Sequence, residues 1–281
     1  MSELQKKIDD AKSIINAAFN EHDPVKVITL FSGGNDSLGL LDLTHRYCGV
    51  NDAGHCNTGI GIEETRIHVR KSCADMGVKL DERHPKPENS YEALIRNYGF
   101  PGPSFHRVAY ARLKERSLRA LKNRYITNGR KERIMFLTGI RGDESAIRAR
   151  YAKTEPDHYR REGSMVWVNP IYNWTKDDLC EYREHYKLPE NPVTPKIHTS
   201  GECLCGAFAH PGEREEIKFW FPSTHSHISG LETLARELGK ESCTWGPSQF
   251  AKKKKEVSGY IGPMCHNCAP SLFDLAQEEG A

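Results

Sequence analysis

The sequence contains no apolar run that approaches the roughly 20 residues that a membrane-spanning helix needs. Its first residues, Met-Ser-Glu-Leu-Gln-Lys-Lys, also lack the apolar core of a secretory signal. An excess of charge of one sign is missing too, because 40 Lys and Arg residues against 38 Asp and Glu residues leave a formal net charge of +2. We therefore expect a cytoplasmic protein with no membrane partner and no global field that would favour nucleic acid.

Cysteine, in contrast, is not scarce, since the chain has nine of them. Structural disulfides are rare in a reducing compartment, so clustered cysteines are better explained as ligands of a metal or cluster. Cys48, Cys56, Cys73 and Cys180 are dispersed along the chain, and we expect them to be buried core thiols. The other five cysteines all follow residue 200.

The length of 281 residues is enough for one large α/β domain and an extension. Apolar periodicity and turn residues predict helices over 3–20, 37–47, 63–76, 91–98, 107–124 and 175–186, with strands near 27–31, 50–56, 78–80, 134–138 and 166–168. This alternation predicts an α/β fold with a doubly wound parallel sheet. We expect an N-terminal helix in 1–24, a nucleotide-binding domain in 25–188 and a Cys-rich C-terminal extension in 189–281.

The most informative stretch is residues 27–37, where an apolar β-branched run breaks into Ser-Gly-Gly-Asn-Asp-Ser and a helical pattern follows. A strand, a Gly-rich turn and a helix N-terminus together make an anion site, because the helix offers unsatisfied N–H groups and a partial positive charge. Gly33 and Gly34 let the backbone approach a phosphate closely. The stretch lacks the Gly-Lys-Ser/Thr of a Walker loop and the third glycine of the dinucleotide fingerprint.

Four ordered segments resemble one family: Ser-Gly-Gly-Asn-Asp-Ser at 32–37, Asn-Thr-Gly-Ile-Gly-Ile-Glu-Glu-Thr at 57–65, Thr-Gly-Ile-Arg-Gly-Asp-Glu-Ser-Ala-Ile-Arg at 138–148, and Asn-Pro-Ile-Tyr-Asn-Trp-Thr-Lys-Asp-Asp at 169–178. They resemble the phosphoadenylylsulfate (PAPS) reductase branch of the PP-loop ATP pyrophosphatase superfamily. Within that branch the sequence is most similar to DndC- and SspD-like proteins and to phage and actinobacterial members. The resemblance implies the adenine nucleotide alpha hydrolase-like, Rossmann-like version of the α/β fold.

All four segments follow or flank predicted strands, so they can converge beyond the C-terminal strand ends, where parallel sheets bind ligands. The resemblance implies that this crevice binds ATP or PAPS, with Mg²⁺ in the ATP case. For nucleotide binding it implies Ser32, Gly33, Gly34, Asp36, Ser37, Thr58, Gly59, Gly139, Arg141, Glu144 and Ser145. For catalysis it implies Asp36, Ser37, Arg141 and Arg148.

Two of these assignments have plain structural alternatives. Arg141 and Arg148 suit charge-assisted contacts to phosphate or sulfate, but they could instead form salt bridges with Asp143 and Glu144. Asp36 is an acidic group beside an anion site, which is costly unless it organises the turn or binds Mg²⁺. Trp174 suits core packing better than ligand contact.

The late cysteines form a third candidate site, made of Cys203, Cys205, Cys243, Cys265 and Cys268. A Cys-x-Cys followed by a Cys-x-x-Cys can supply the four thiolates of a [4Fe–4S] cluster or of a tetrahedral Zn²⁺ site. A redox-active Cys-x-x-Cys is an alternative, and the fifth cysteine could carry a persulfide. Similarity to cluster-bearing sulfur-transfer proteins favours iron–sulfur.

A basic segment covers residues 107–133. Such a run is usually a solvated helix face, and the alternative is a phosphate contact with tRNA or DNA.

The sequence departs from the reductases of this branch in two respects. It holds no Glu-Cys-Gly-Leu-His segment, whose cysteine attacks sulfur in assimilatory PAPS and adenylylsulfate reductases. It also has a Cys-x-Cys in place of the adjacent Cys-Cys pair of cluster-type adenylylsulfate reductases. We therefore place first an ATP pyrophosphatase that adenylates an acceptor for sulfur incorporation, as in DNA phosphorothioation or nucleic-acid thiolation. The alternatives are a PAPS or adenylylsulfate reductase that releases sulfite, and a non-catalytic nucleotide-sensing or DNA-binding partner with structural zinc. The partners considered are an adenine nucleotide, a cysteine desulfurase as sulfur donor, a DNA or tRNA acceptor and a second copy in a homodimer.

Overall fold

The computed structural model describes residues 2–143, 158–240 and 244–246. Its chain forms two compact units, each assembled from three separate stretches. The first unit contains residues 1–55, 67–83 and 118–191, and the second contains residues 56–66, 84–117 and 192–281. The boundaries predicted from sequence follow chain order, whereas these units interleave along the chain. Each unit is therefore described by itself.

A six-stranded sheet with the order β3-β2-β1-β4-β6-β5 organises the first unit. The pairs β1–β2, β1–β4 and β4–β6 are parallel, and β5 runs antiparallel to its neighbour β6. The strands are β1 Lys26–Leu30, β2 Asp52–Cys56, β3 Lys79–Arg83, β4 Ile134–Leu137, β5 Tyr159–Glu162 and β6 Met165–Val168. The prediction of an α/β fold with a doubly wound, mainly parallel sheet is confirmed.

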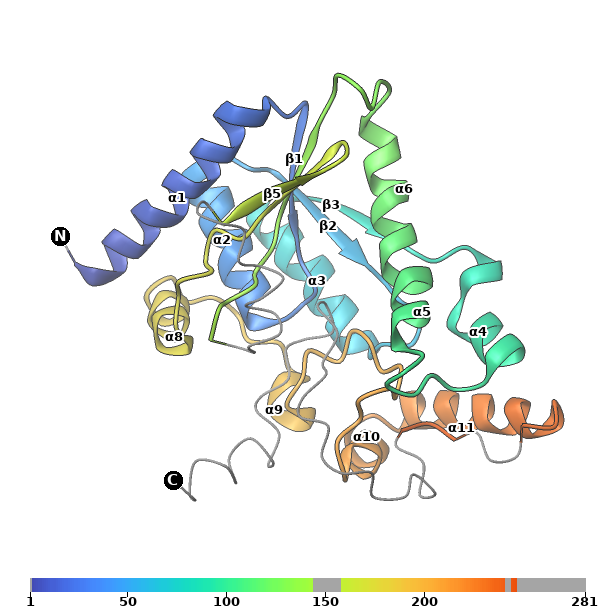
Figure 1. Ribbon diagram of the computed structural model, residues 1–281. Coiled ribbons are helices and arrows are strands. Elements are labelled where there is room, and N and C mark those ends of the chain that lie inside the picture. The colour runs from blue at the N-terminus through green and yellow to red at the C-terminus, as the bar shows by residue number, and fades with distance from the viewer. Residues whose placement is uncertain (1, 144–157, 241–243, 247–281) are drawn as a thin grey trace, which may run out of the picture. The chain divides into compact units, whose positions relative to one another are not determined.

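One face of this sheet is covered by α1, α2 and α8, which pack against β4 and β6 (Figure 1). The C-terminal part of α3 packs beside α2 on the same face. The bounds of these helices are α1 Glu3–His22, α2 Asn35–Cys48, α3 Glu63–Met76 and α8 Lys176–His185. Their apolar stripes bury Ile8, Leu40 and Tyr182, which supplies the main hydrophobic stabilisation of the unit.

The opposite face is covered by α6, Arg116–Tyr125, whose Leu121 packs on Ile28 and Phe136. Gly54 of β2 permits this approach, because a methyl group there would lie 2.8 Å from a Leu121 methyl carbon. The helix predicted over 107–124 is confirmed, with a π-turn in its middle that was not predicted. It is divided into α5 His106–Tyr110, the π-turn η2 Ala111–Glu115 and α6.

The second unit is built from short helices around its own apolar core, which includes Ile62, Leu94 and Ile217. Besides α5 and η2, its elements are η1 Pro87–Asn89, α4 Tyr91–Tyr98, α9 Thr194–Ile197, α10 Glu213–Trp220 and α11 Pro222–Glu237. Within the predicted C-terminal extension after residue 189, α11 has 16 residues.

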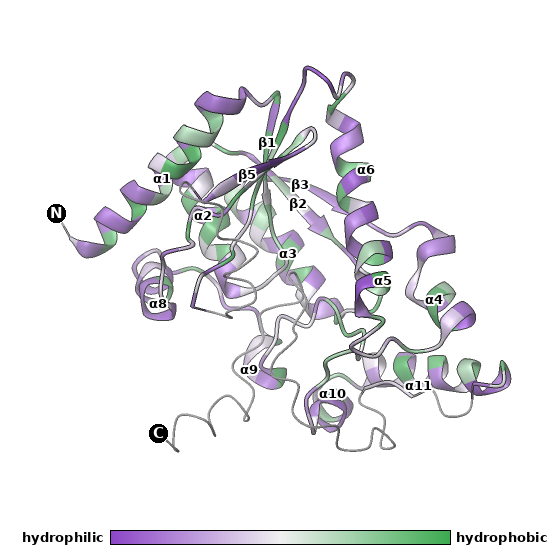
Figure 2. Ribbon diagram, viewed as in Figure 1, coloured by the Kyte–Doolittle hydropathy of each residue, from purple (hydrophilic) through white to green (hydrophobic). Residues whose placement is uncertain are grey.

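Several local signals located the elements correctly. The predicted bounds of α3 and α4 agree with the structure, and α3 is followed by Gly77 in the left-handed region at φ 69°. Thr175 and Asp178 form the reciprocal capping box at the start of α8. Strand β5 was not predicted, because its Tyr-Arg-Arg-Glu sequence is polar, as the purple ribbon in Figure 2 shows.

The dispersed cysteines are less buried than expected. Cys73 is buried, but Cys48, Cys56 and Cys180 are partly exposed, so the prediction of four buried core thiols is wrong for these three residues. Burial nevertheless raises the pKa of Cys56 and of Cys73 to about 12, which keeps both thiols protonated at neutral pH. Trp174 is buried and packs with Tyr182, as predicted.

No helix within the described residues is long and apolar enough to span a membrane.

Candidate functional site

The Gly-rich loop lies between β1 and α2 in the first unit. Gly33 adopts φ 84°, a conformation that glycine reaches without strain, and Gly34 is the N-cap of α2 with no side-chain cap hydrogen bond. The hydroxyl of Ser37 donates to the Gly34 carbonyl at 2.9 Å and lies 3.2 Å from the hydroxyl of Ser32. The loop is thus folded on itself, and the start of α2 has the backbone donors that an anion would use.

A buried ion-pair network joins this loop to the segment after β4. The Arg141 guanidinium donates through Nε to Asp36 Oδ2 at 2.9 Å and through Nη1 to Asp143 Oδ1 at 2.6 Å. The alternative considered from the sequence was a salt bridge between Arg141 and Asp143. That pair is present, but Arg141 is only 6% exposed, so its guanidinium does not lie at the surface. Asp36 therefore has a buried cationic partner in Arg141.

The segment 138–143 also lies directly against the start of α2 and against the segment 169–178. A methyl group on Gly139 would lie 3.1 Å from the backbone of Asp36 and Ser37. Gly142 N–H donates to the Tyr172 carbonyl at 2.8 Å, and Asp143 accepts from the backbone N–H of Lys176 at 3.1 Å. Three of the four motif segments therefore meet within the first unit.

Asn191 is a part of this site that the sequence did not reveal. Its side chain is fully buried and donates through Nδ2 to the Gly33 carbonyl at 2.9 Å. This bond fixes the glycine that turns the loop. No motif or periodicity marks Asn191, because the contact spans 158 residues of sequence.

The remaining motif segment, 57–65, belongs to the second unit, where it pairs with residues 200–202. Thr58 donates its backbone N–H to Glu202 Oε1 at 2.9 Å and its hydroxyl to the Glu202 carbonyl at 2.7 Å. Ile62 N–H donates to the Gly201 carbonyl at 2.8 Å, and the Thr65 hydroxyl donates to the Ser200 carbonyl. Thr58 therefore has a clear positioning partner, while its predicted contact with a nucleotide stays a prediction, as does that of Gly59.

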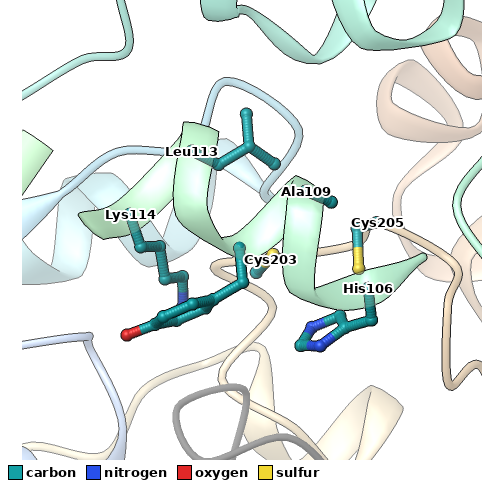
Figure 3. Close-up of a pocket in the computed structure, with 7 residues that line it drawn as sticks. His106, Ala109, Leu113, Lys114, Cys203 and Cys205 are labelled. Carbon is teal, nitrogen blue, oxygen red and sulfur yellow. The ribbon is translucent and has the colours of Figure 1, made fainter. Parts of the chain in front are cut away.

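Cys203 and Cys205 line a pocket of the second unit. Figure 3 shows both thiols turned toward the helical segment that carries His106, Ala109 and Lys114. Burial lowers the pKa of the His106 imidazole, the nearby Lys114 acts in the same direction, and Cys203 acts against them. The neutral form of the His106 imidazole is therefore favoured beside the thiols.

The backbone around the two thiols is held by side chains from elsewhere in the unit. Tyr91 donates its hydroxyl to the Cys205 carbonyl at 2.8 Å, and Trp245 donates Nε1 to the Leu204 carbonyl at 2.7 Å. Cys205 is buried and Cys203 is partly exposed.

Several predicted site residues lie outside the described residues: Glu144, Ser145, Arg148, Cys243, Cys265 and Cys268. Among the described residues, no group of three or more His, Cys, Asp or Glu side chains is placed to hold a metal ion. Cys203 and Cys205 share a pocket and could supply two thiolates. The [4Fe–4S] cluster and its Zn²⁺ alternative stay predictions, as does Mg²⁺.

Part of the basic segment 107–133 is engaged within the chain. The Arg112 guanidinium stacks on the Tyr98 ring at 4.9 Å, and Arg124 donates to Asp81 at 3.2 Å. Arg116 contacts Asn89. The alternative, a contact of this segment with tRNA or DNA, stays a prediction.

Comparison with known proteins identifies related reductases. The model of the phosphoadenosine phosphosulfate reductase domain matches residues 26–205. An adenosine 5'-phosphosulfate reductase of Burkholderia cepacia is 23% identical over 236 residues, covering 82% of this chain and 88% of the relative. The enzyme of the same name from Rhizobium tropici is 25% identical over 176 residues, covering 62% of this chain and 93% of the relative.

A solved structure supports the fold. The phosphoadenylyl-sulfate reductase of Candida auris, crystallised as a phosphate complex, superposes with a TM-score of 0.50 at 18% identity, covering 69% of this chain and 92% of the other.

Proposed function

Because this chain belongs to the phosphoadenosine phosphosulfate reductase domain family, we propose that it is a sulfonucleotide reductase. Its substrate would be adenosine 5'-phosphosulfate or its 3'-phosphorylated form, and its products sulfite and the corresponding adenine nucleotide. The sequence alone placed adenylation for sulfur incorporation first. The curated relatives, which cover most of this chain and are named as reductases, favour sulfonucleotide reduction instead.

The observation that carries the proposal is the meeting of three motif segments around the start of α2. The Gly-rich loop, the segment 138–143 and the segment 169–178 are joined there by the Asp36–Arg141–Asp143 network and by Gly139. Backbone N–H groups at this helix N-terminus can bind an anionic group of the nucleotide. Arg141, held on two sides by carboxylates, is oriented before a substrate arrives, which reduces the entropy lost on binding.

The reaction balances with a dithiol as the reductant. A thiolate attacks the sulfur of the sulfonucleotide, the S–O bond to the nucleotide phosphate breaks, and the nucleotide leaves as a phosphate monoester. A second thiol then attacks the sulfur of the first thiol, the bond to the sulfonate group breaks, and sulfite leaves. The two thiols end as a disulfide, so that two electrons pass from the dithiol to the sulfate group. In the described part of the chain, Cys203 is the best-placed thiol for this chemistry, because it is partly exposed beside His106 and Lys114.

The decisive test is sulfite release. Anaerobically purified protein is incubated with adenosine 5'-phosphosulfate or its 3'-phosphorylated form and a dithiol such as reduced thioredoxin, and sulfite and AMP (or its 3'-phosphorylated form) are quantified. We expect equimolar sulfite and nucleotide, lost in Arg141→Ala and in Cys203→Ser. Absence of sulfite from both substrates with wild-type protein would refute the proposal.

A second candidate is favoured by one observation, the lack of a Glu-Cys-Gly-Leu-His segment in the sequence. In that case the chain would adenylate an acceptor oxygen with ATP and Mg²⁺, releasing pyrophosphate before sulfur is inserted. Incubation with Mg²⁺-ATP and DNA or tRNA separates the two candidates, because pyrophosphate release there, together with no sulfite from either sulfonucleotide, supports only the second.

A further inference from the structure

The segment pairing in the second unit brings two chemically important stretches of chain together through one residue. Glu202 is 2% exposed, immediately precedes Cys203, and contacts Thr58 in two ways. Its side-chain carboxylate accepts the Thr58 backbone N–H, while its main-chain carbonyl accepts the Thr58 hydroxyl. A buried carboxylate is retained only where such hydrogen bonds compensate its desolvation.

The backbone on either side of the Glu202–Thr58 contact is closely packed. A methyl group on Gly61 would collide with the Glu202 carbonyl, and Gly201 adopts φ 69° while a methyl group there would lie 2.7 Å from Val193. Ile62 N–H closes the pairing on the Gly201 carbonyl. The stretch 57–62 and the stretch 201–205 therefore form one tightly packed element, which we call the Glu202 seam.

We propose that Glu202 is a positioning residue that couples the loop after β2 to the Cys203–Cys205 thiols, so that occupancy of this loop by an adenine nucleotide changes the accessibility of the thiols. The coupling has a direct route. The Glu202 carboxylate accepts the Thr58 N–H, and Cys203 directly follows Glu202 in the chain. The carbonyls of the next two residues, Leu204 and Cys205, accept hydrogen bonds from Trp245 and Tyr91. The nucleotide-dependent part of this inference rests on the proposed function.

The test measures the rate at which iodoacetamide alkylates each thiol, read by peptide mass spectrometry on the full-length protein. Without nucleotide, Glu202→Ala should raise the alkylation rate of buried Cys205 by about tenfold, which corresponds to a loss of roughly 1.4 kcal/mol of local hydrogen bonding. Glu202→Gln should restore a rate within about threefold of wild type, because the amide oxygen can still accept the Thr58 N–H.

Glu213→Ala is the matched control. Glu213 is also buried in the second unit and also accepts a backbone N–H, from His210 at 3.0 Å, but it lies outside the seam. Its substitution should leave both thiol rates at the wild-type level. A Glu202→Ala rate that matches wild type, or a Glu213→Ala rate that rises equally, would overturn the inference.

Nucleotide coupling is tested with AMP, which has no sulfate to react. AMP should slow alkylation of Cys203 in wild type and in Glu202→Gln, and should have no effect on the rate in Glu202→Ala. Protection that survives in Glu202→Ala would contradict the coupling. If no variant or wild type releases sulfite or binds AMP, the proposed function fails, while the rates without nucleotide still decide whether Glu202 positions the thiols.

Discussion

Arg141 has two carboxylate partners, Asp36 and Asp143, of which the sequence indicated only Asp143. A pattern can show that an arginine follows a strand, but it cannot show that Asp36, 105 positions earlier, accepts its Nε–H. The guanidinium is therefore already balanced by carboxylates in the protein without ligand, and its orientation is set by the fold.

Removing Arg141 should destabilise the protein strongly. Arg141→Ala leaves the buried Asp36 carboxylate without its cation, and breaking such a pair costs about 3–5 kcal/mol. Urea unfolding at pH 7 would measure this loss. Lys71→Ala is the control, because the Lys71–Asp75 pair is exposed and should be worth less than about 1 kcal/mol. Equal effects of the two substitutions would contradict the role given to Arg141.

His68 should make the stability of the folded protein fall at acidic pH. Burial lowers its pKa from 6.5, the positive charge of Arg183 acts in the same direction, and its ring packs edge-on against Phe31. Because the folded protein releases this proton more readily than the unfolded chain, stability should fall as pH drops below 6.5 through the lowered pKa.

Urea midpoints of wild type and His68→Gln between about pH 7.5 and pH 5 test this linkage. The wild-type midpoint should fall more steeply on acidification than that of His68→Gln, in which this residue no longer titrates. Parallel curves would show that His68 contributes nothing to the pH dependence.

At the scale of elements, the sequence predicted most of the parallel sheet and its helices, because apolar periodicity and capping residues are local signals. Helices α4 and α8 were located from the sequence, and the structure shows side-chain caps at Ser90 and Thr175. The π-turn η2 was missed, since no local signal separates it from an ordinary helix. The pairing of residues 57–65 with 200–202 depends on contacts across more than 130 residues, which periodicity cannot show.

The Glu202 seam should be sensitive to a single added methyl group. Gly61→Ala places a carbon against the Glu202 carbonyl, and such overpacking typically costs about 1–3 kcal/mol. Gly230→Ala is the control, because that glycine lies inside α11 with open space around its Cβ position, and alanine should stabilise the helix by about 0.5–1 kcal/mol.

Thermal unfolding of both variants measures the two effects. Opposite shifts of the melting temperature are expected, and a stabilised Gly61→Ala would rule out the close packing described here.

At the scale of the whole molecule, the sequence indicated four motif segments but not the unit to which each of them belongs. The four motif segments were expected to converge on one crevice. The structure joins three of them in the first unit and places residues 57–65 in the second, where they pair with the stretch beside Cys203. Which residues share a unit depends on how the chain passes back and forth, and no local pattern encodes that.

Because each unit is made of three separate stretches of chain, truncation after the first unit should leave an incomplete second unit. A fragment ending at residue 191 retains residues 56–66 and 84–117 but loses the helices α9, α10 and α11 that complete their core. Ile62, Leu94 and Ile95 would then be exposed, so we expect the fragment to bind a hydrophobic dye and to aggregate. Dye fluorescence and size-exclusion chromatography check this, and a soluble monomer without dye binding would contradict it.

The two borders of the six-stranded sheet have a further consequence for self-association. β5 ends the sheet on one side with Arg160, Arg161 and Glu162 exposed, and β3 ends it on the other with Lys79 exposed. Short, charged border strands repel an incoming strand from another molecule and so oppose aggregation. The borders of this sheet therefore oppose the joining of two copies into one continuous sheet.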